Sequence, residues 1–299
     1  MRWWTITRDA VMLWFASNPF SYAGALAFYT LFSLAPVVII AVSVTGIVLG
    51  EEAAQGEIVG QLQDVMGRQA AQAVEQAVAR SRIQESGMLP TLLGVAALLV
   101  GATTVFGQMQ LSLNAIWGVT ARPKRNTVLA LVMSRLLSLT IVLVIGFVLL
   151  VSLLAGVILR AVLEFTDRFA PAIAALLSGA DVLLSLLSVA LLFAAIFKVL
   201  PDVTLRWRDV AVGALVTALL FTLGRFAIAA YLAHTATAST YGAAGSVVLI
   251  LLWVYYSSLI LLFGAAFTKT HLLARGGAVV PRHTAVLVKR ELVTDDTSA

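Results

Sequence analysis

Residues 210–232 read VAVGALVTALLFTLGRFAIAAYL, a stretch that is apolar apart from one arginine, Arg225. A helix needs about 20 apolar residues to cross a hydrocarbon core about 30 Å thick, so the stretch predicts a membrane-spanning helix. Arg225 lies fifteen residues past Val210, which is about 22 Å along a helix that rises about 1.5 Å per residue. A permanently charged guanidinium is costly there unless a partner, a water-filled cavity or a route to the headgroups receives it. Arg225 is therefore the strongest functional lead in the sequence.

The composition of the whole chain indicates a polytopic membrane protein. The 299 residues are 61% hydrophobic and only 12% charged, which is more apolar than a soluble domain can bury. Long uncharged runs recur along the chain, and each is expected to be helical because lipid offers the backbone no hydrogen-bond partners. We predict an all-α bundle of six transmembrane helices, although roughly four to seven spans fit the same runs. The predicted spans are residues 22–49, 88–108, 127–159, 174–199, 210–232 and 244–268.

The positions of Lys and Arg predict how this bundle is oriented. Most of the 20 basic residues fall before the first span or after the second, fourth and sixth spans. Because basic loops stay in the cytoplasm, both termini are expected on the cytoplasmic side. Charges beside membrane spans suit anionic headgroups, so we expect anionic membrane lipids as partners and no nucleic acid. Ahead of the first span, Trp3, Trp4 and Trp14 predict a short helix lying at the membrane surface.

Two segments outside the spans have distinct patterns. Residues 51–82 carry apolar side chains at helical spacing and a net negative charge, which predicts an amphipathic helix on the periplasmic side. That helix is either a cover packed on the bundle or a gate over a pathway. The membrane domain is expected to comprise residues 1–272, followed by a polar, disordered cytoplasmic tail over residues 273–299. The oligomeric state is left open, and a homo-oligomer is one of the alternatives.

Polar residues within the spans suggest what Arg225 could bind. If spans one, five and six converge, their polar side chains would line a cleft that leads to this arginine. A guanidinium presents a bidentate fork to phosphate, so the cleft would suit the headgroup of an anionic lipid. The candidate substrate-binding residues are Arg225, Arg135, Tyr29, Ser33, Tyr255 and Tyr256. The candidate conformational residues are Pro36, Gly242 and Gly245.

Each of these residues also has a structural interpretation. Arg135 and Arg225 can extend to the headgroups, or Arg225 can form an internal ion pair. The tyrosines can fill a packed interface, and Pro36 can simply shape its helix. Small residues in span five favour close helix approach over the lining of a pore. These small residues are Gly213, Ala214, Thr217 and Ala218.

The residues that hydrolytic or metal-dependent chemistry needs are not visible in the pattern. The chain contains no cysteine, and His234, His271 and His283 fall on different segments without the spacing of metal ligands. Asp202 and Asp209, which follow the fourth span, are interpreted as solvated loop residues. We therefore expect no enzyme, no metal and no cofactor.

Several short runs together resemble a known family. They are residues 25–36 (ALAFYTLFSLAP), 113–119 (LNAIWGV), 197–202 (FKVLPD), 224–225 (GR) with 231–232 (YL), and 241–246 (YGAAGS) leading to 252–256 (LWVYY). In this order they are similar to the YihY/BrkB family of bacterial inner-membrane proteins, over about residues 10–270. The resemblance implies six spans in the bacterial inner (plasma) membrane with both termini inside. It implies no settled activity: members have carried a virulence-factor label, a ribonuclease label regarded as a misassignment, and a suggested role in moving lipids.

One position departs from the family pattern. Members usually show Gly-Ala-Glu-Phe-Thr near the end of span six, whereas this chain has Gly264-Ala265-Ala266-Phe267-Thr268. The carboxylate missing at Ala266 puts any ion-paired or proton-coupled role of that position in doubt.

These observations favour a translocator of an amphipathic, anionic envelope substrate such as a lipid. Headgroups would enter the cleft between spans one, five and six, and Arg225 would bind the anionic group. Rocking around Pro36 and a turn at Gly242 and Gly245 would change access. The alternative is a structural or scaffolding envelope protein without transport activity, whose outer helix and tail bind partners.

Overall fold

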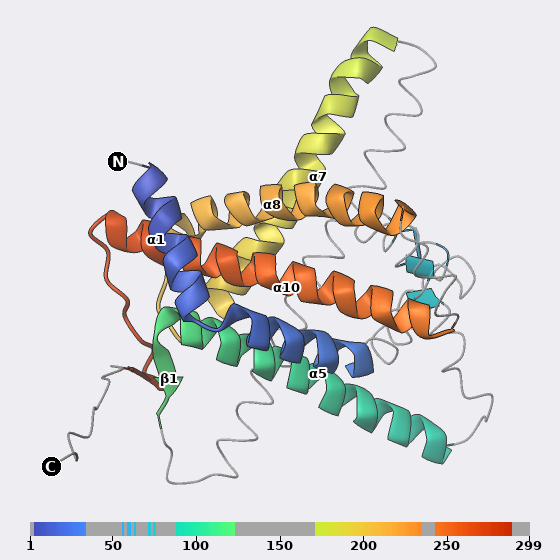
Figure 1. The fold of residues 1–299 in the computed structure, drawn as a ribbon, viewed down its shortest axis with the longest axis horizontal. Coiled ribbons are helices and arrows are strands. Elements are labelled where there is room, and N and C mark those ends of the chain that lie inside the picture. Colours follow the sequence, from blue (N-terminus) through green and yellow to red (C-terminus); the bar gives the residue numbers. More distant parts are fainter. Residues whose placement is uncertain are drawn as a thin grey trace, which may run out of the picture.

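A computed structural model describes residues 3–33, 56, 59–60, 63, 71–72, 74–75, 88–122, 171–234 and 243–288 of the chain. These residues are mostly helical, as predicted (Figure 1). The helices are α1 (Trp3–Ala16), α5 (Met88–Trp117), α7 (Pro171–Val199), α8 (Trp207–His234) and α10 (Ala243–Ala274), together with a helical segment at residues 19–33.

Four of these helices coincide with predicted spans. α5, α7, α8 and α10 contain the second, fourth, fifth and sixth spans, and residues 19–33 include the start of the first. In the described part of the chain, Trp207–Ile228 and Val247–Ala274 are long and apolar enough to cross a membrane, and Ser185–Val199 is a shorter apolar helix. Residues 127–159 lie outside the described part, so the count of six spans stays a prediction.

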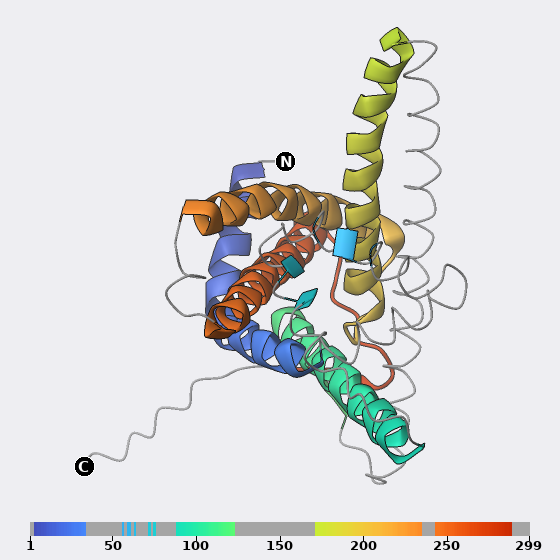
Figure 2. The ribbon, with the colours of Figure 1, turned by 90° about the vertical axis from the view of Figure 1, so that its right-hand side faces the viewer.

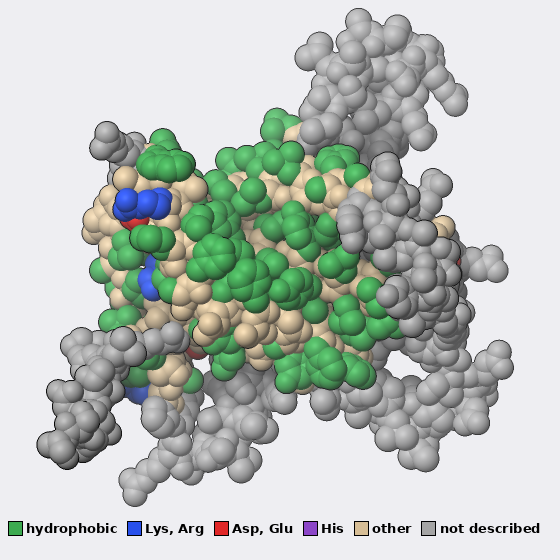
Figure 3. Space-filling view, in the orientation of Figure 1, with side chains coloured by type: hydrophobic (Ala, Val, Ile, Leu, Met, Phe, Trp, Pro, Cys, Tyr) green, Lys and Arg blue, Asp and Glu red, His purple; other side chains and the backbone are tan. Residues whose placement is uncertain are grey.

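The helices form a bundle with one crossing member. α5, α8 and α10 run along the length of the molecule, whereas α7 crosses them steeply and projects beyond them (Figure 1 and Figure 2). α7 packs on α8, α8 packs on α10, and α10 contacts both α1 and α5. The C-terminal ends of α5, α7 and α10 therefore meet the N-terminal end of α8 at one end of the bundle, which we call the charged end. Lys and Arg side chains gather at this end in Figure 3.

Reciprocal glycine and threonine contacts bring α8 and α10 close together. A side chain at Gly213 would collide with Thr268, and one at Gly264 would collide with Thr217. Each threonine hydroxyl donates to the glycine carbonyl one turn earlier in its own helix, at 2.6 Å in α8 and 2.7 Å in α10. The hydroxyls are thus satisfied without a partner in the other helix. The predicted role of these small residues in close helix approach is confirmed for Gly213 and Thr217.

The main hydrophobic cluster lies inside the charged end. It joins Trp117 of α5, Phe197 of α7, Val210 of α8 and Leu262 of α10, all of them almost completely buried. Because four helices contribute, this cluster is what holds their ends together by burial of apolar surface.

The residues after α10 differ from the predicted disordered tail. Residues 273–274 still belong to α10, and Ala285–Leu287 form strand β2. β2 pairs antiparallel with β1 (Val119–Ala121), which directly follows α5, with Val119 opposite Leu287. A further antiparallel bridge joins Val203 to Pro281. The prediction of disorder is therefore wrong for residues 273–288, while residues 289–299 lie outside the described part.

Candidate functional site

Three basic side chains at the charged end bind backbone carbonyls. Lys269 Nζ donates to the Ile116 carbonyl at 2.8 Å, and Arg282 Nη2 donates to the Lys198 carbonyl at 3.0 Å. These carbonyls lie in the last turns of α5 and α7, where the helix itself supplies no donor and a cation is favoured. Lys198 Nζ in turn donates to the Leu205 carbonyl at 2.9 Å. These three cations therefore stabilise helix ends and the α7–α8 connection.

Asp202 accepts hydrogen bonds from two amide side chains of α5. Asn114 Nδ2 donates to Asp202 Oδ2 at 2.8 Å, and Gln110 Nε2 donates to Oδ1 at 3.2 Å. The Asp202 backbone N–H donates a hydrogen bond to Asn114 Oδ1 at 2.8 Å. The pair fastens the α7–α8 connection to α5. The interpretation of Asp202 as a solvated loop residue is therefore wrong.

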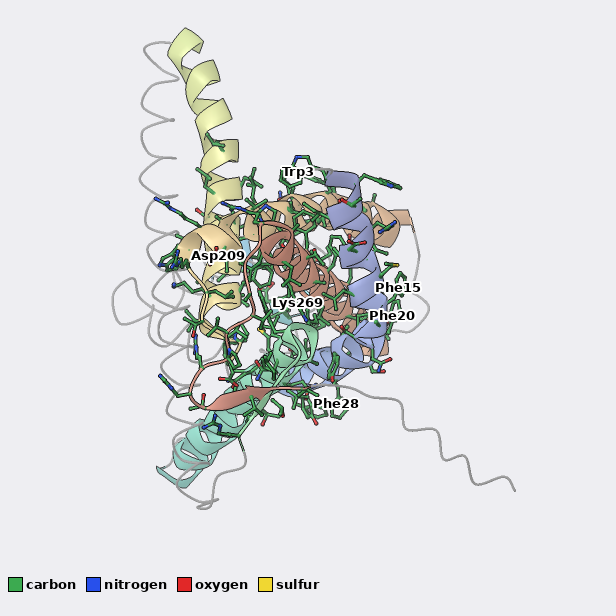
Figure 4. The ribbon with its side chains drawn as sticks, turned by 90° about the vertical axis from the view of Figure 1, so that its left-hand side faces the viewer. Trp3, Phe15, Phe20, Phe28, Asp209 and Lys269 are labelled. Atoms are coloured by element: carbon green, nitrogen blue, oxygen red, sulfur yellow. The ribbon has the colours of Figure 1, made fainter. Side chains whose placement is uncertain are left out.

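Asp209 also has a structural partner. Its Oδ2 accepts a bond from the Arg206 backbone N–H at 2.9 Å, just before α8 begins. An acidic side chain that reaches back across three residues to the start of a helix satisfies an otherwise unpaired N–H and interacts favourably with the helix dipole. The end view in Figure 4 shows Asp209 at the rim of the bundle and Lys269 between the helices.

At the opposite end of α8 and α10 the packing is apolar. Ile228 of α8 and Trp253 of α10 are buried together, with Leu31 of the 19–33 helix packed against them. Ala71 and Val74 are helical and completely buried in the same cluster. We call this cluster the apolar end. Spans one, five and six meet there, and the residues that join them are hydrophobic.

Arg225 lies at the edge of the apolar end and is half-buried. Its guanidinium carbon is 5.0 Å from the ring centroid of Phe226, which is strongly exposed. The neighbouring Gly224 packs directly on Tyr256, because a side chain at this position would collide with the tyrosine ring and hydroxyl. One predicted substrate-binding tyrosine thus lies against the backbone that carries Arg225.

The other predicted site residues are distributed differently. Ser33 is buried, donates to the Thr30 carbonyl at 3.1 Å and faces Gly101 of α5. Tyr29 lies at the surface, with its ring edge-on to Phe28 at 5.7 Å. Tyr255 is half-buried in α10, and Gly245 lies in the first turn of that helix rather than in a turn before it. Arg135, Pro36 and Gly242 lie outside the described residues.

Ala266 is completely buried in the main hydrophobic cluster, close to Leu262 and Ala265. A carboxylate at this position would lose its hydration among apolar side chains and would need a specific partner. Alanine instead contributes to the tight packing of α10 against its neighbours. The departure at this position therefore has a packing explanation in this chain.

Sequence reasoning missed the bond between Asn114 and Asp202. Both residues lie in runs that carry the family resemblance, LNAIWGV and FKVLPD, and the structure shows that these two runs bond to each other. The presence of both runs in one chain was the sequence signal that could have suggested this contact. In the described part of the chain, no three His, Asp or Glu side chains gather in a way that could hold a metal ion.

Comparisons with known proteins identify the family. A family model described as "Virulence factor BrkB" matches residues 16–284. A UPF0761 membrane protein of Mannheimia succiniciproducens is 28% identical over 248 residues, which cover 82% of each chain. Another, from Azoarcus sp. (strain BH72), is 28% identical over 250 residues, covering 83% of this chain and 59% of that protein. A third, from Tolumonas auensis, is 38% identical over 76 residues, or 25% of each chain.

The chain spans less than two thirds of the Azoarcus and Tolumonas proteins. No solved structure matches this chain. All three relatives are named as membrane proteins, and the family model covers nearly the whole chain. The protein is therefore an integral membrane protein that belongs to the virulence factor BrkB family.

Proposed function

We propose that this protein translocates an amphipathic, anionic envelope substrate, such as a lipid, in the bacterial inner membrane. The observation that carries the proposal is Arg225, a half-buried cation in a helix apolar and long enough to cross a bilayer. An intramembrane cation is costly and commonly marks a substrate or ion pathway. Lys198, Lys269 and Arg282 at the charged end bind backbone carbonyls, so we do not propose them as substrate-binding residues.

The surroundings of Arg225 suit a substrate with a charged head and an apolar tail. The guanidinium lies beside the exposed ring of Phe226, and Leu223 is exposed on the same stretch of α8. An acyl chain could lie on these two side chains while its phosphate reaches the guanidinium. The phenol of Tyr256 packs on Gly224. Its O–H could donate a second hydrogen bond to a phosphate oxygen.

The proposed movement takes place at the apolar end. The charged end is joined by directional hydrogen bonds and a strand pair, whereas the apolar end is held by hydrophobic contacts. Apolar contacts are non-directional and tolerate sliding better than a hydrogen-bond network does. The 19–33 helix, α8 and α10 would therefore separate around Arg225 while the charged end stays closed.

Reconstituted vesicles test this function directly. Transfer of a labelled phosphatidylglycerol between leaflets should exceed that in protein-free vesicles, and Arg225→Ala should lower the rate about tenfold, since losing a phosphate contact costs about 1.5 kcal/mol. Arg208→Ala, at the exposed charged end, is the matched control and should transfer at the wild-type rate. We expect Arg135→Ala to have a smaller effect than Arg225→Ala. Wild-type rates equal to those of empty vesicles across several anionic lipids would refute the proposal.

The second candidate is a scaffold that organises other envelope proteins, without catalysis or transport. It is favoured by the folded segment after α10, which reaches both β1 and the α7–α8 connection and could present residues 289–299 to a partner. Removal of residues 289–299 leaves this fold in place and separates the two functions. A scaffold would lose its activity, whereas a translocator would keep its transfer rate. Stoichiometric metal in the purified protein would instead favour an enzyme.

A further inference from the structure

Helix α1 has two apolar faces, and the bundle covers only one of them. Ile6 and Ala10 are buried against Phe267 of α10, with Val212 and Val216 of α8 beside them. The large exposed side chains of the other face are Trp4, Val11, Met12 and Phe15. Figure 4 shows Phe15 pointing outward, away from the bundle. An amphipathic surface helix would show mainly polar side chains there, whereas on α1 the exposed Arg8 lies among these larger apolar side chains.

Ring contacts show that α1 is inclined along α10. Trp3 stacks on His271 with centroids 5.8 Å apart, whereas Trp14 meets Phe263 edge-on at 6.2 Å. Phe263 precedes His271 by eight residues, which corresponds to about 12 Å along α10. Phe263 is also nearer the middle of the apolar segment Val247–Ala274. The C-terminal end of α1 therefore lies deeper in the membrane segment than its N-terminal end.

A tight turn fixes this inclination. Ser17 Oγ donates to the Leu13 carbonyl at 2.7 Å, and Asn18 adopts a left-handed conformation with φ of 52°. Asparagine tolerates this conformation better than most residues. Phe20, in the next helix, packs on Trp14 with centroids 5.5 Å apart. The end of α1 is thus joined firmly to the helix of residues 19–33.

The outward face of α1 continues a larger apolar surface. Leu219 and Leu223 of α8 and Phe28 and Phe32 of the 19–33 helix are exposed, and hydrophobic side chains recur across the described part of the face in Figure 3. The charges on α1 neutralise each other, since Arg8 Nη2 lies 3.0 Å from Asp9 Oδ1. In a membrane protein, a continuous apolar surface of this kind is matched by acyl chains.

We propose that α1 is a slanted helix whose outward face contacts the acyl chains of the leaflet at the charged end. Trp4 lies at the level of the headgroups, where tryptophan is favoured, and Phe15 lies deeper by on the order of 10 Å. Arg8 lies between them and extends toward the headgroups, with Asp9 reducing its cost. The helix is therefore partly immersed instead of lying flat on the surface.

Nitroxide labels on the full-length protein in lipid nanodiscs test this proposal. The chain contains no cysteine, so Trp4→Cys, Val11→Cys and Phe15→Cys each give a single labelling site at an exposed position. Collision of the label with oxygen, which partitions into lipid, is compared with collision with a water-soluble nickel complex. Leu287→Cys on the exposed side of β2 is the aqueous control, and Leu219→Cys on α8 is the lipid control.

We expect oxygen to dominate at positions 11 and 15, and the depth to increase from position 4 to position 15 by on the order of 10 Å. Equal depths at the three positions would overturn the slanted arrangement. Dominant nickel collisions would show that the face lies in water. Low collision rates with both reagents would show that protein, such as a second copy of the chain, covers the face.

Discussion

Different interactions hold the two ends of the α8–α10 pair together: hydrogen bonds at the charged end and hydrophobic contacts at the apolar end. At the charged end, hydrogen bonds join residues far apart in the chain, as between Asn114 and Asp202 or Lys269 and Ile116. At the apolar end, Ile228, Trp253 and Leu31 meet through hydrophobic contact, with Arg225 at its edge. A basic side chain is therefore not by itself evidence of a functional site. Lys198, Lys269 and Arg282 bind carbonyls at the charged end, and Arg225 lies next to the exposed ring of Phe226.

The largest effect is expected at the close contact between α8 and α10 near the charged end. Gly264→Leu would force a side chain into Thr217 and Phe197, which separates α8 from α10. We expect a loss of more than about 4 kcal/mol of stability, or no folded protein, because overpacking at a helix crossing has no room to relax. Thermal unfolding in detergent measures the effect. Gly107→Leu, in open space on α5, is the matched control and should unfold like wild type.

A smaller effect is expected from Asp202→Ala at the charged end. The substitution leaves the side-chain amides of Asn114 and Gln110 without their carboxylate acceptor. The expected loss is about 2 kcal/mol, typical of hydrogen bonds to a partly buried charge. Asp9→Ala removes a carboxylate whose ion-pair partner, Arg8, is exposed and should change the unfolding temperature little. Equal effects of the two substitutions would show that Asp202 does not hold the charged end together.

The smallest of the stability effects is expected from Lys269→Met. It keeps the length of the side chain but removes the donor to the Ile116 carbonyl at the end of α5. A loss of about 1 kcal/mol follows from one helix-end hydrogen bond and its dipole interaction. Arg275→Met, at an exposed position just after α10, serves as the comparison in the same unfolding assay. An unchanged unfolding temperature for Lys269→Met would mean that the carbonyl needs no cation.

Hydropathy located the helices because it is a property of consecutive residues. The spans predicted at 210–232 and 244–268 lie within α8 and α10. The same signal underestimated α5, which continues past residue 108 to Trp117, since residues beyond the hydrocarbon are no longer selected for apolarity. Pattern also predicted the close helix approach at Gly213 and Thr217, because small residues one turn apart form a flat surface.

The contacts of the charged end could not be read from local pattern. β1 and β2 contain three residues each, too few to show the alternation that identifies a strand. Their pairing joins segments on either side of most of the chain, and only the folded bundle brings them together. From the sequence, Lys269 is interpreted only as a basic residue that follows a span and helps to set the orientation. The carbonyl that it binds lies in α5, far away in the chain. Contacts between residues far apart in the chain leave no periodic pattern in the sequence.

The proposed function requires that the side chain at position 225 faces a space that water or headgroups can enter, while its neighbours face lipid. The absence of native cysteine allows a direct measurement: Arg225→Cys and Leu223→Cys, the latter at an exposed position, are each treated with a charged, membrane-impermeant thiol reagent in nanodiscs. A thiol needs water to ionise and react, so we expect modification at position 225 to be about tenfold faster than at position 223. Equally slow modification at both positions would contradict it, because the arginine would then face a closed or purely lipidic environment.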